Sequence, residues 1–208
     1  MTTRFGIDEL ERLMRMRRDV RHFISDPVAP ELIEAAIRAG NLAPSVGYSQ
    51  PWRWVRVDDP VRRAAVIASH DAVNAAARRE SHADRADEYG ALKLSGLREA
   101  PVHLAVFCDM ATSVGGGLGR TTMPQTLEYS VVMAIYGFWL AARAHELGVG
   151  WVSILDPAAV TSVLDVPSDW RLIAYLAVGY PAFASATPEL AERGWEHASA
   201  AAAEITQR

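Results

Sequence analysis

Hydrophobic residues recur with helical spacing in two segments near the start of the chain. In the first, an apolar stripe begins at Ile7, and Asp8 and Glu11 have the spacing of a capping box. The second begins at Pro30 and ends at Gly40, residue types that are common in the first turn and at the end of a helix. We therefore expect a first helix that leads into an arginine-rich run, and a second helix between the proline and the glycine.

The rest of the chain alternates short apolar runs with longer helical patterns. Strands are predicted over residues 54–57, 101–108, 149–154 and 172–178, and helices over residues 60–70, 127–147 and 157–164. Residues 72–98 are polar and alanine-rich, which favours a helix with a break near Gly90, and the glycines of residues 114–119 predict a surface loop. The order of elements is typical of an α+β fold, a three-layer α-β-α sandwich with helices on both faces of a mixed sheet.

The composition is that of one globular domain. The chain has 208 residues, of which 50% are hydrophobic, and a net charge of −4. No linker-like stretch or charge block divides it, so we expect a single domain over residues 1–208. The apolar content excludes disorder, and the lack of a basic excess excludes a nucleic-acid-binding protein.

Three further patterns concern location and chemistry. The longest apolar stretch, residues 131–142, is too short to span a bilayer, so we expect a cytoplasmic protein with no membrane partner. Cys108 is the only cysteine and lies in an apolar run, where a buried, unreactive thiol is expected. The histidines show no metal-binding spacing and no Gly-x-Ser-x-Gly elbow occurs, so we expect neither a metal site nor a serine hydrolase.

Residues 17–23 hold three arginines around one aspartate. Arg17, Arg18 and Arg21 offer planar guanidinium donors that match the oxygens of a phosphate, in hydrogen bonds about twice as strong as neutral ones. A phosphate would repel the carboxylate of Asp19, which suggests that Asp19 contacts another part of the same ligand. The alternative is a solvent-exposed helix end whose arginines complement the helix dipole.

Two later segments, together with the arginine run, carry a resemblance to a known family. Residues 43–52 form a proline-bounded loop that carries Ser45, a glycine and an amide, and residues 148–154 read Gly-Val-Gly-Trp-Val-Ser-Ile. In this order and spacing, the three segments resemble the flavin-binding nitroreductase-like family. The Arg-Arg-Asp-Val-Arg run and Gly-Trp-Val-Ser resemble its BluB branch, the 5,6-dimethylbenzimidazole synthases, over about residues 11–195. Shorter matches to that branch are Leu92-Lys93-Leu94, Glu99-Ala100-Pro101, Gly119-Arg120-Thr121-Thr122 and Tyr129-Ser130.

The resemblance implies FMN, bound as a cofactor or consumed as a substrate, at the interface of an obligate homodimer. It implies that Arg17 and Arg18 hold the phosphate, while Asp19 and Arg21 reach the ribityl chain and the pyrimidine edge. The other implied flavin contacts are Ser45 of the partner subunit, Leu94, Val152, Ser153 and Leu176.

In the BluB branch, reduced FMN reacts with dioxygen, its ring system is fragmented, and the lower ligand of cobalamin is released. The resemblance implies that Asp19 relays protons, that Ser153 orients the reacting oxygen, and that a separate flavin reductase is a partner. Residues 85–100 would form a lid that excludes water and bulky electron donors, although their pattern also fits a plain amphipathic helix. From the residues alone, Ser153 could be satisfied within its sheet and Asp19 could pair with a neighbouring arginine.

Departures from the branch pattern keep other functions open. Tyr136-Gly137 stand where the branch has Gln-Asn, and Pro181-Ala182 stand where it has Val-Ser. One alternative is an NAD(P)H-dependent FMN nitroreductase or quinone reductase. Another is a non-catalytic flavin-binding or storage protein.

Overall fold

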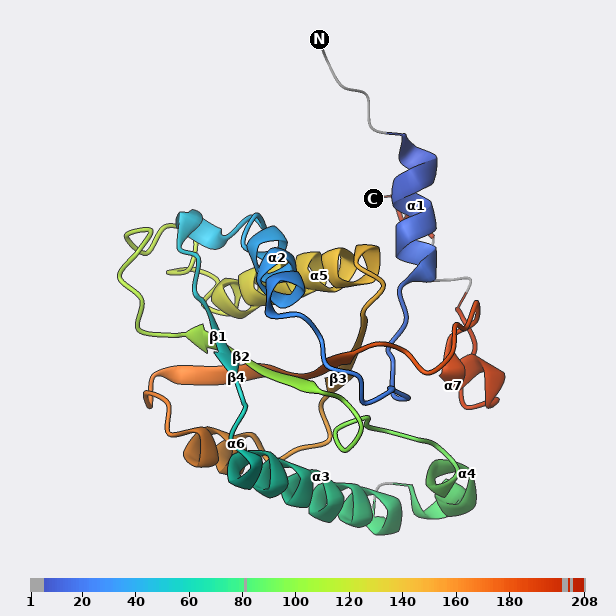
Figure 1. The fold of residues 1–208 in the computed structure, drawn as a ribbon. Coiled ribbons are helices and arrows are strands. Elements are labelled where there is room, and N and C mark those ends of the chain that lie inside the picture. The colour runs from blue at the N-terminus through green and yellow to red at the C-terminus, as the bar shows by residue number, and fades with distance from the viewer. Residues whose placement is uncertain (1–5, 81, 200–201, 203, 208) are drawn as a thin grey trace.

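A computed structural model describes residues 6–80, 82–199, 202 and 204–207. Its elements, in chain order, are α1 (Ile7–Met16), α2 (Pro30–Gly40), the 3-10 helix η1 (Val46–Tyr48), β1 (Trp52–Arg56), α3 (Pro60–Glu80), the 3-10 helix η2 (Ala83–Arg85), α4 (Ala86–Gly90), β2 (Val102–Asp109), α5 (Thr126–Ala144), β3 (Gly148–Val152), α6 (Pro157–Leu164), β4 (Trp170–Gly179) and α7 (Glu189–Glu192). Figure 1 shows them as three layers, with α2 and α5 on one face of the sheet and α3 and α6 on the other. The predicted α+β class and the helices on both faces are confirmed.

The four strands have the order β1-β2-β4-β3, and every neighbouring pair is antiparallel. The prediction of a mixed sheet is therefore wrong for these strands. The crossover through α5 makes β3 parallel to β2, but β4 inserts between them and pairs antiparallel with both. The parallel pairing in the described part of the chain is an isolated bridge between Asp19 and Val149.

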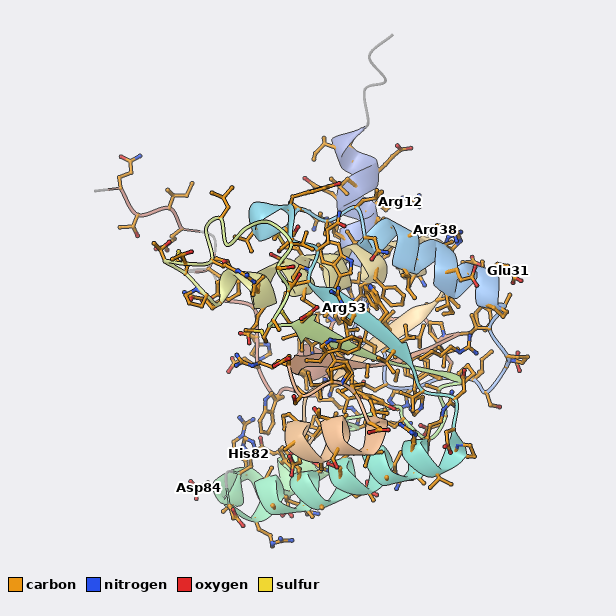
Figure 2. All side chains as sticks on the ribbon, turned by 90° about the vertical axis from the view of Figure 1, so that its left-hand side faces the viewer. Arg12, Glu31, Arg38, Arg53, His82 and Asp84 are labelled. Atoms are coloured by element: carbon orange, nitrogen blue, oxygen red, sulfur yellow. The ribbon has the colours of Figure 1, made fainter. Side chains whose placement is uncertain are left out.

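The central strand β2 explains why the chain has a core on each side of the sheet. Its side chains point alternately to the two faces. Leu104, Val106 and Cys108 belong to the core beneath α2 and α5, whereas Ala105 and Phe107 belong to the core beside α3 and α6. Side chains fill the space between the sheet and both helix layers (Figure 2). Burial of each large apolar side chain contributes about 1.5–3 kcal/mol, which makes this two-sided sheet the main source of stability.

The helix boundaries follow the sequence pattern where breakers are present. The helices predicted to begin at Pro30 and Pro157 do so, and Asp156 caps α6 by accepting hydrogen bonds through Oδ1 from two backbone amides. The helices predicted over residues 60–70 and 72–98, in contrast, are joined without a break into α3, which ends at Glu80. The expected break near Gly90 is found, but residues 91–98 are not helical.

Helix α1 has no buried residue, a feature that it shares with the short helix α7. It stands beside the C-terminal half of α5 (Figure 1). Its apolar residues Ile7, Leu10, Met14 and Met16 are exposed. Among the residues that the structure describes, no helix is both long and apolar enough to cross a membrane.

Candidate functional site

The arginine-rich run lies along the edge strand β3 and is fixed to it by backbone contacts. The amide of Val20 donates a hydrogen bond to the Val149 carbonyl at 3.0 Å, next to the Asp19–Val149 bridge. The amide of Trp151 donates to Oδ1 of Asp19 at 2.9 Å. Two segments about 130 positions apart in sequence, which the sequence analysis placed in one site, are therefore in direct contact.

Gly150 allows this close approach. A Cβ atom at this position would lie well inside 3.0 Å of the Val20 carbonyl oxygen, a separation that real Cβ atoms essentially never show. A Cβ on Gly148 would likewise lie 2.8 Å from Cγ2 of Val20. Both glycines belong to the same face of β3, since they are two positions apart. Glycine inside a strand is typical of a place that another backbone approaches closely.

The carboxylate of Asp19 joins β3 to Arg21. Its Oδ2 accepts hydrogen bonds from Nη2 of Arg21 at 2.6 Å and from Nε at 3.1 Å, while Oδ1 accepts from Trp151. Arg21 also donates from Nη1 to the Lys93 carbonyl at 3.2 Å. The ion pair left open by the sequence analysis is present, and it connects the run to the segment predicted to form a lid.

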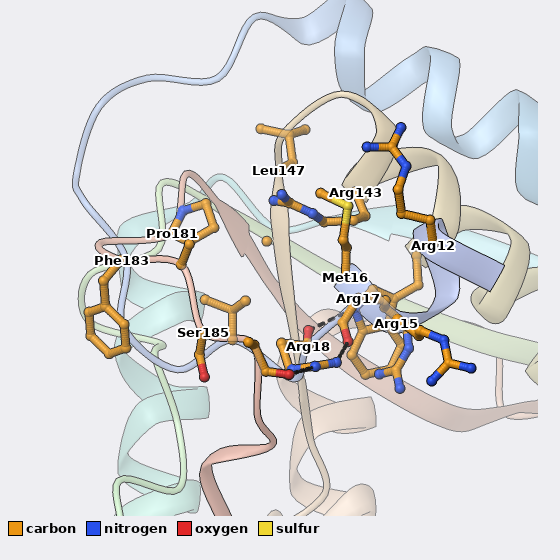
Figure 3. Close-up of a pocket in the computed structure, with 15 residues that line it drawn as sticks. Arg12, Arg15, Met16, Arg17, Arg18, Arg143, Leu147, Pro181, Phe183 and Ser185 are labelled. Carbon is orange, nitrogen blue, oxygen red and sulfur yellow. Dashed lines mark hydrogen bonds between the residues drawn. The ribbon is translucent and has the colours of Figure 1, made fainter. Parts of the chain in front are cut away.

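A pocket of about 700 Å³ opens beside Arg17 and Arg18 (Figure 3). Five arginines and an apolar wall line it: Arg12, Arg15, Met16, Arg17, Arg18, Val20, Trp139, Arg143, Leu147, Gly148, Pro181, Phe183, Ala184, Ser185 and Ala186. No acidic residue is among the described residues that line it. The Nε atoms of Arg17, Arg18 and Arg143 are buried without a hydrogen-bond partner in the described structure. A buried N–H donor without an acceptor is costly unless a ligand supplies one, so the donor set of this pocket fits a phosphate.

Three of these arginines came from outside the predicted run. Arg12 and Arg15 are three positions apart on α1, so they share one side of that helix. Arg143 is the only cation in α5 and lies in its last turn. The sequence feature that could have indicated Arg143 is a single arginine in a mostly apolar helix. An arginine in the last turn is also favoured by the helix dipole, so this feature alone does not indicate a ligand.

The segment after β4 forms the far wall of the pocket. It is tied down by hydrogen bonds from the Ala182 amide to the His22 carbonyl at 2.9 Å and from the Ile24 amide to the Tyr180 carbonyl at 3.0 Å. Arg18 also donates to the Ala186 carbonyl. On the other side of the run, a smaller hollow is lined by Asp19, Arg21 and the acidic residues of α7. The two hollows share the wall at Phe183 and Ser185.

The remaining predicted site residues fall into two groups. Ser153 is exposed just after β3. Leu94 is half-buried and follows Lys93, whose carbonyl accepts a hydrogen bond from Arg21, so Leu94 lies near the arginine run. Val152 and Leu176, in contrast, are buried in the cores on opposite faces of the sheet. Their side chains are covered by protein, which leaves Ser153 as the exposed member of the strand end.

Ser45 lies near the opposite end of α5 from the arginine run. The Val46 amide donates to Oγ of Ser130 at 3.0 Å, whereas the run is joined to α5 by a hydrogen bond from Nε1 of Trp139 to the Arg18 carbonyl at 3.2 Å. Ser130 and Trp139 are nine positions apart, which is about 13 Å along a helix. A single chain therefore does not bring Ser45 beside the arginines.

The loop that carries Ser45 shows backbone strain. Tyr48 and Gln50 have φ angles of 55° and 44°, in the left-handed region that non-glycine residues rarely adopt. Ser49 is buried, and its hydroxyl has no hydrogen-bond partner in the described structure. Strain and unsatisfied groups of this kind concentrate at functional sites.

The predicted lid segment, residues 85–100, is anchored at both ends. Tyr89 is buried and donates a hydrogen bond to Oδ1 of Asn74 at 2.8 Å. At the other end, the Leu97 carbonyl lies 2.9 Å from Nε2 of His103. His103 is also 3.0 Å from the Tyr175 hydroxyl, and burial lowers its pKa to about 4, with a smaller contribution from the charge of Arg63.

Comparison with known proteins decides the family. Residues 14–180 match the Nitroreductase family. The chain belongs to this family. Within it, the chain is 56% identical over 189 residues to the 5,6-dimethylbenzimidazole synthase of Rhodospirillum rubrum, covering 91% of this chain and 90% of that protein. The corresponding enzyme of Rhodobacter capsulatus is 47% identical over 189 residues, with 91% of each chain covered.

A solved structure of another family member gives the same fold. The crystal structure of oxidized iodotyrosine deiodinase bound to FMN and 3-iodo-L-tyrosine aligns with a TM-score of 0.72 and 25% identity, covering 85% of this chain and 91% of that one. The resemblance inferred from the arginine run and from Gly-Trp-Val-Ser is thereby confirmed at the level of the family and of its 5,6-dimethylbenzimidazole synthase relatives.

Proposed function

We propose that this protein is a 5,6-dimethylbenzimidazole synthase that fragments reduced FMN with dioxygen. The observation that carries the proposal is the position of Asp19, which is fixed by Trp151 and Arg21 beside a pocket lined with arginines. The 56% identity to the Rhodospirillum rubrum synthase supports it. A separate flavin reductase would supply the reduced FMN, and a cytoplasmic location stays a prediction.

The arginine pocket would receive the phosphate of FMN. Its unpaired guanidinium donors fit a dianion, and the neighbouring Asp19 and Arg21 would face the ribityl chain and the pyrimidine edge. When bound and reduced, FMN supplies the ring system that reacts with dioxygen and is itself consumed. The protein would hold this ring against the exposed end of β3, where Ser153 lies.

Asp19 would be the residue that moves a proton. Its carboxylate oxygens accept hydrogen bonds from a guanidinium and from a backbone amide, which fixes their orientation, and Asp19 lines the smaller hollow. Ser153 would orient the reacting oxygen with its hydroxyl. Positioned groups of this kind contribute about 10²–10⁴-fold in rate.

The site would be completed in a homodimer. Helix α5 exposes Tyr129, Val132, Met133 and Tyr136, whose exposed fractions are 40–54% and whose spacing puts them on one helix face. The exposed apolar stripe of α1 and the strained Ser45 loop flank the same helix. Pairing through α5 would cover these surfaces and could bring Ser45 of the partner subunit to the arginine pocket.

The residues that depart from the branch pattern lie at different distances from the proposed ligand. A Cβ on Gly40 would lie 2.7 Å from the Ala134 carbonyl oxygen, and Gly137 lies against Gly40, so Gly137 serves the close packing of α2 on α5. Tyr136 belongs to the exposed face of α5. Pro181, in contrast, lines the arginine pocket, so this position bears directly on the ligand.

The test is aerobic incubation with chemically reduced FMN, followed by mass spectrometry for 5,6-dimethylbenzimidazole. The wild type should form it, whereas Asp19→Asn and Ser153→Ala should bind FMN and form about 10²–10⁴-fold less. Asp26→Asn, an exposed aspartate outside the site, is the matched control and should have wild-type activity. Rapid oxidation of NADH or NADPH with nitroaromatic or quinone acceptors, without benzimidazole, would replace the proposal by a nitroreductase, and FMN binding without turnover would replace it by a flavin carrier.

A further inference from the structure

Helix α5 contributes a phosphate ligand from outside the arginine run. We propose that Arg143 and Arg17 hold the phosphate of FMN, and that Arg18 is a positioning residue that braces the pocket wall. This inference rests on the proposed function only in that the ligand is FMN. It changes the role expected of Arg18 and adds a residue that the sequence pattern did not indicate.

The guanidinium group of Arg143 has no hydrogen-bond or ion-pair partner among the residues that the structure describes. It emerges from the last turn of α5 and lines the pocket beside Met16 and Leu147 (Figure 3). Its Nε is buried with no hydrogen-bond acceptor, and no carboxylate lies within ion-pair distance among the described residues. A planar fork in this state can donate two parallel hydrogen bonds to a phosphate.

Arg17 approaches the same pocket from the run itself. Its guanidinium carbon lies 4.9 Å from the centre of the Trp139 ring, which orients the group over an aromatic face without using its N–H donors. Its Nε is also buried without a partner in the described structure. Arg17 and Arg143 thus come from two different elements and both retain donors for an anion.

Both terminal nitrogens of Arg18 already donate a hydrogen bond to a backbone carbonyl. Nη1 donates to the Arg17 carbonyl at 2.6 Å, and Nη2 donates to the carbonyl of Ala186. The bond to Ala186 links the arginine run to the segment that carries Phe183 and Ser185. We therefore infer that Arg18 holds the wall of the pocket in place through its two terminal nitrogens, while its buried Nε has no acceptor in the described structure.

The experiment compares FMN with riboflavin, which has the same ring system and no phosphate. Affinities for both oxidised flavins are measured by quenching of flavin fluorescence in the full chain. Arg17→Gln and Arg143→Gln should each weaken FMN binding by about 10- to 100-fold, which corresponds to loss of a hydrogen bond to a charged group, and should leave riboflavin binding unchanged. Arg18→Gln should weaken both flavins by a similar factor. Arg38→Gln is the matched control, because Arg38 is an exposed arginine on α2 outside the pocket (Figure 2).

A second measurement uses inorganic phosphate as a competitor. Phosphate should displace FMN from the wild type, and this competition should be weaker in Arg143→Gln. If that variant does not fold, Arg143→Lys keeps the charge and should still reduce the preference for FMN over riboflavin, because an ammonium lacks the planar fork. An unchanged preference in Arg143→Gln, or a selective loss of FMN binding in Arg18→Gln, would overturn the inference while leaving the proposed function standing. A wild-type protein that binds neither flavin would overturn both.

Discussion

Replacement of Gly150 by alanine tests whether the site depends on the close contact between β3 and the arginine run. The φ angle of Gly150 is not in the left-handed region, so alanine is allowed by the backbone. At such a position, alanine would ordinarily stabilise a protein by about 0.4–1 kcal/mol, because it restricts the unfolded chain. Here the new Cβ would collide with the Val20 carbonyl, so we expect the opposite sign.

The magnitude follows from the bonds that the collision would break. Displacement of the run would remove the hydrogen bond from the Val20 amide to Val149, worth about 1 kcal/mol, and the bond from the Trp151 amide to the carboxylate of Asp19, worth about 1.5–3 kcal/mol. Asp19 is about one third exposed, which favours the lower part of that range. After the entropic gain of alanine is subtracted, the net loss of stability should be about 2 kcal/mol.

Thermal unfolding followed by circular dichroism measures this loss. In a protein of this size, a loss of about 2 kcal/mol lowers the Tm by about 4–8 °C. FMN binding should weaken in the same variant, because the arginine run would move away from its pocket. Gly6→Ala is the control, since its Cβ would meet nothing closer than 3.7 Å, and its Tm should stay close to that of the wild type. An unchanged or higher Tm in Gly150→Ala, together with wild-type FMN affinity, would refute the reasoning.

Three further predictions concern the core. The pKa of His103 is lowered to about 4, below its unfolded value near 6.5. The stabilisation from the neutral His103 is therefore fully present above pH 6.5, and the free energy of unfolding should fall by about 3 kcal/mol as the pH drops towards 4. Equilibrium urea unfolding at several pH values should show this slope, and a His103→Gln variant should lack it. Burial raises the pKa of the Cys108 thiol to about 12, so a disulfide reagent at pH 8 should label it only after unfolding; rapid labelling of the native protein would contradict this. Phe138→Ala should cost about 3–5 kcal/mol in chemical unfolding because the side chain is fully buried between α5 and the sheet, and a loss below 1 kcal/mol would argue against the packing described.

Local patterns predicted most of the secondary structure, and their failures have physical causes. The helices that begin at Pro30 and Pro157 carry their own boundary signals. The boundary predicted between residues 70 and 72 was wrong, because the polar second half of α3 has little apolar periodicity but contains no breaker before Glu80. That part of the helix is held instead by a contact between Asn74 and Tyr89, which no local pattern shows.

The sheet and the site needed information from distant parts of the chain. No strand pattern indicates that β4 inserts between β2 and β3, so the strand directions were predicted wrongly. The arginine run and Gly-Trp-Val-Ser were predicted to share a site, and the Asp19–Trp151 hydrogen bond brings them together. The role of Gly150 could not be predicted, because it depends on which backbone lies against the strand. Arg143 was missed because a single cation near the end of a helix usually needs no ligand to explain it.

The lack of buried residues in α1 has a consequence for how the molecule orders itself. A helix of ten residues is shorter than the roughly 12–15 residues at which isolated helices become marginally stable in water. In a lone chain, the amides of α1 should therefore exchange with solvent hydrogen much faster than those of β2 or α5, through local opening that leaves the rest folded. Any surface that covers the apolar stripe of α1 would slow this exchange and would steady the arginines that follow it. Dimer formation and phosphate binding would then both depend on the folding of α1.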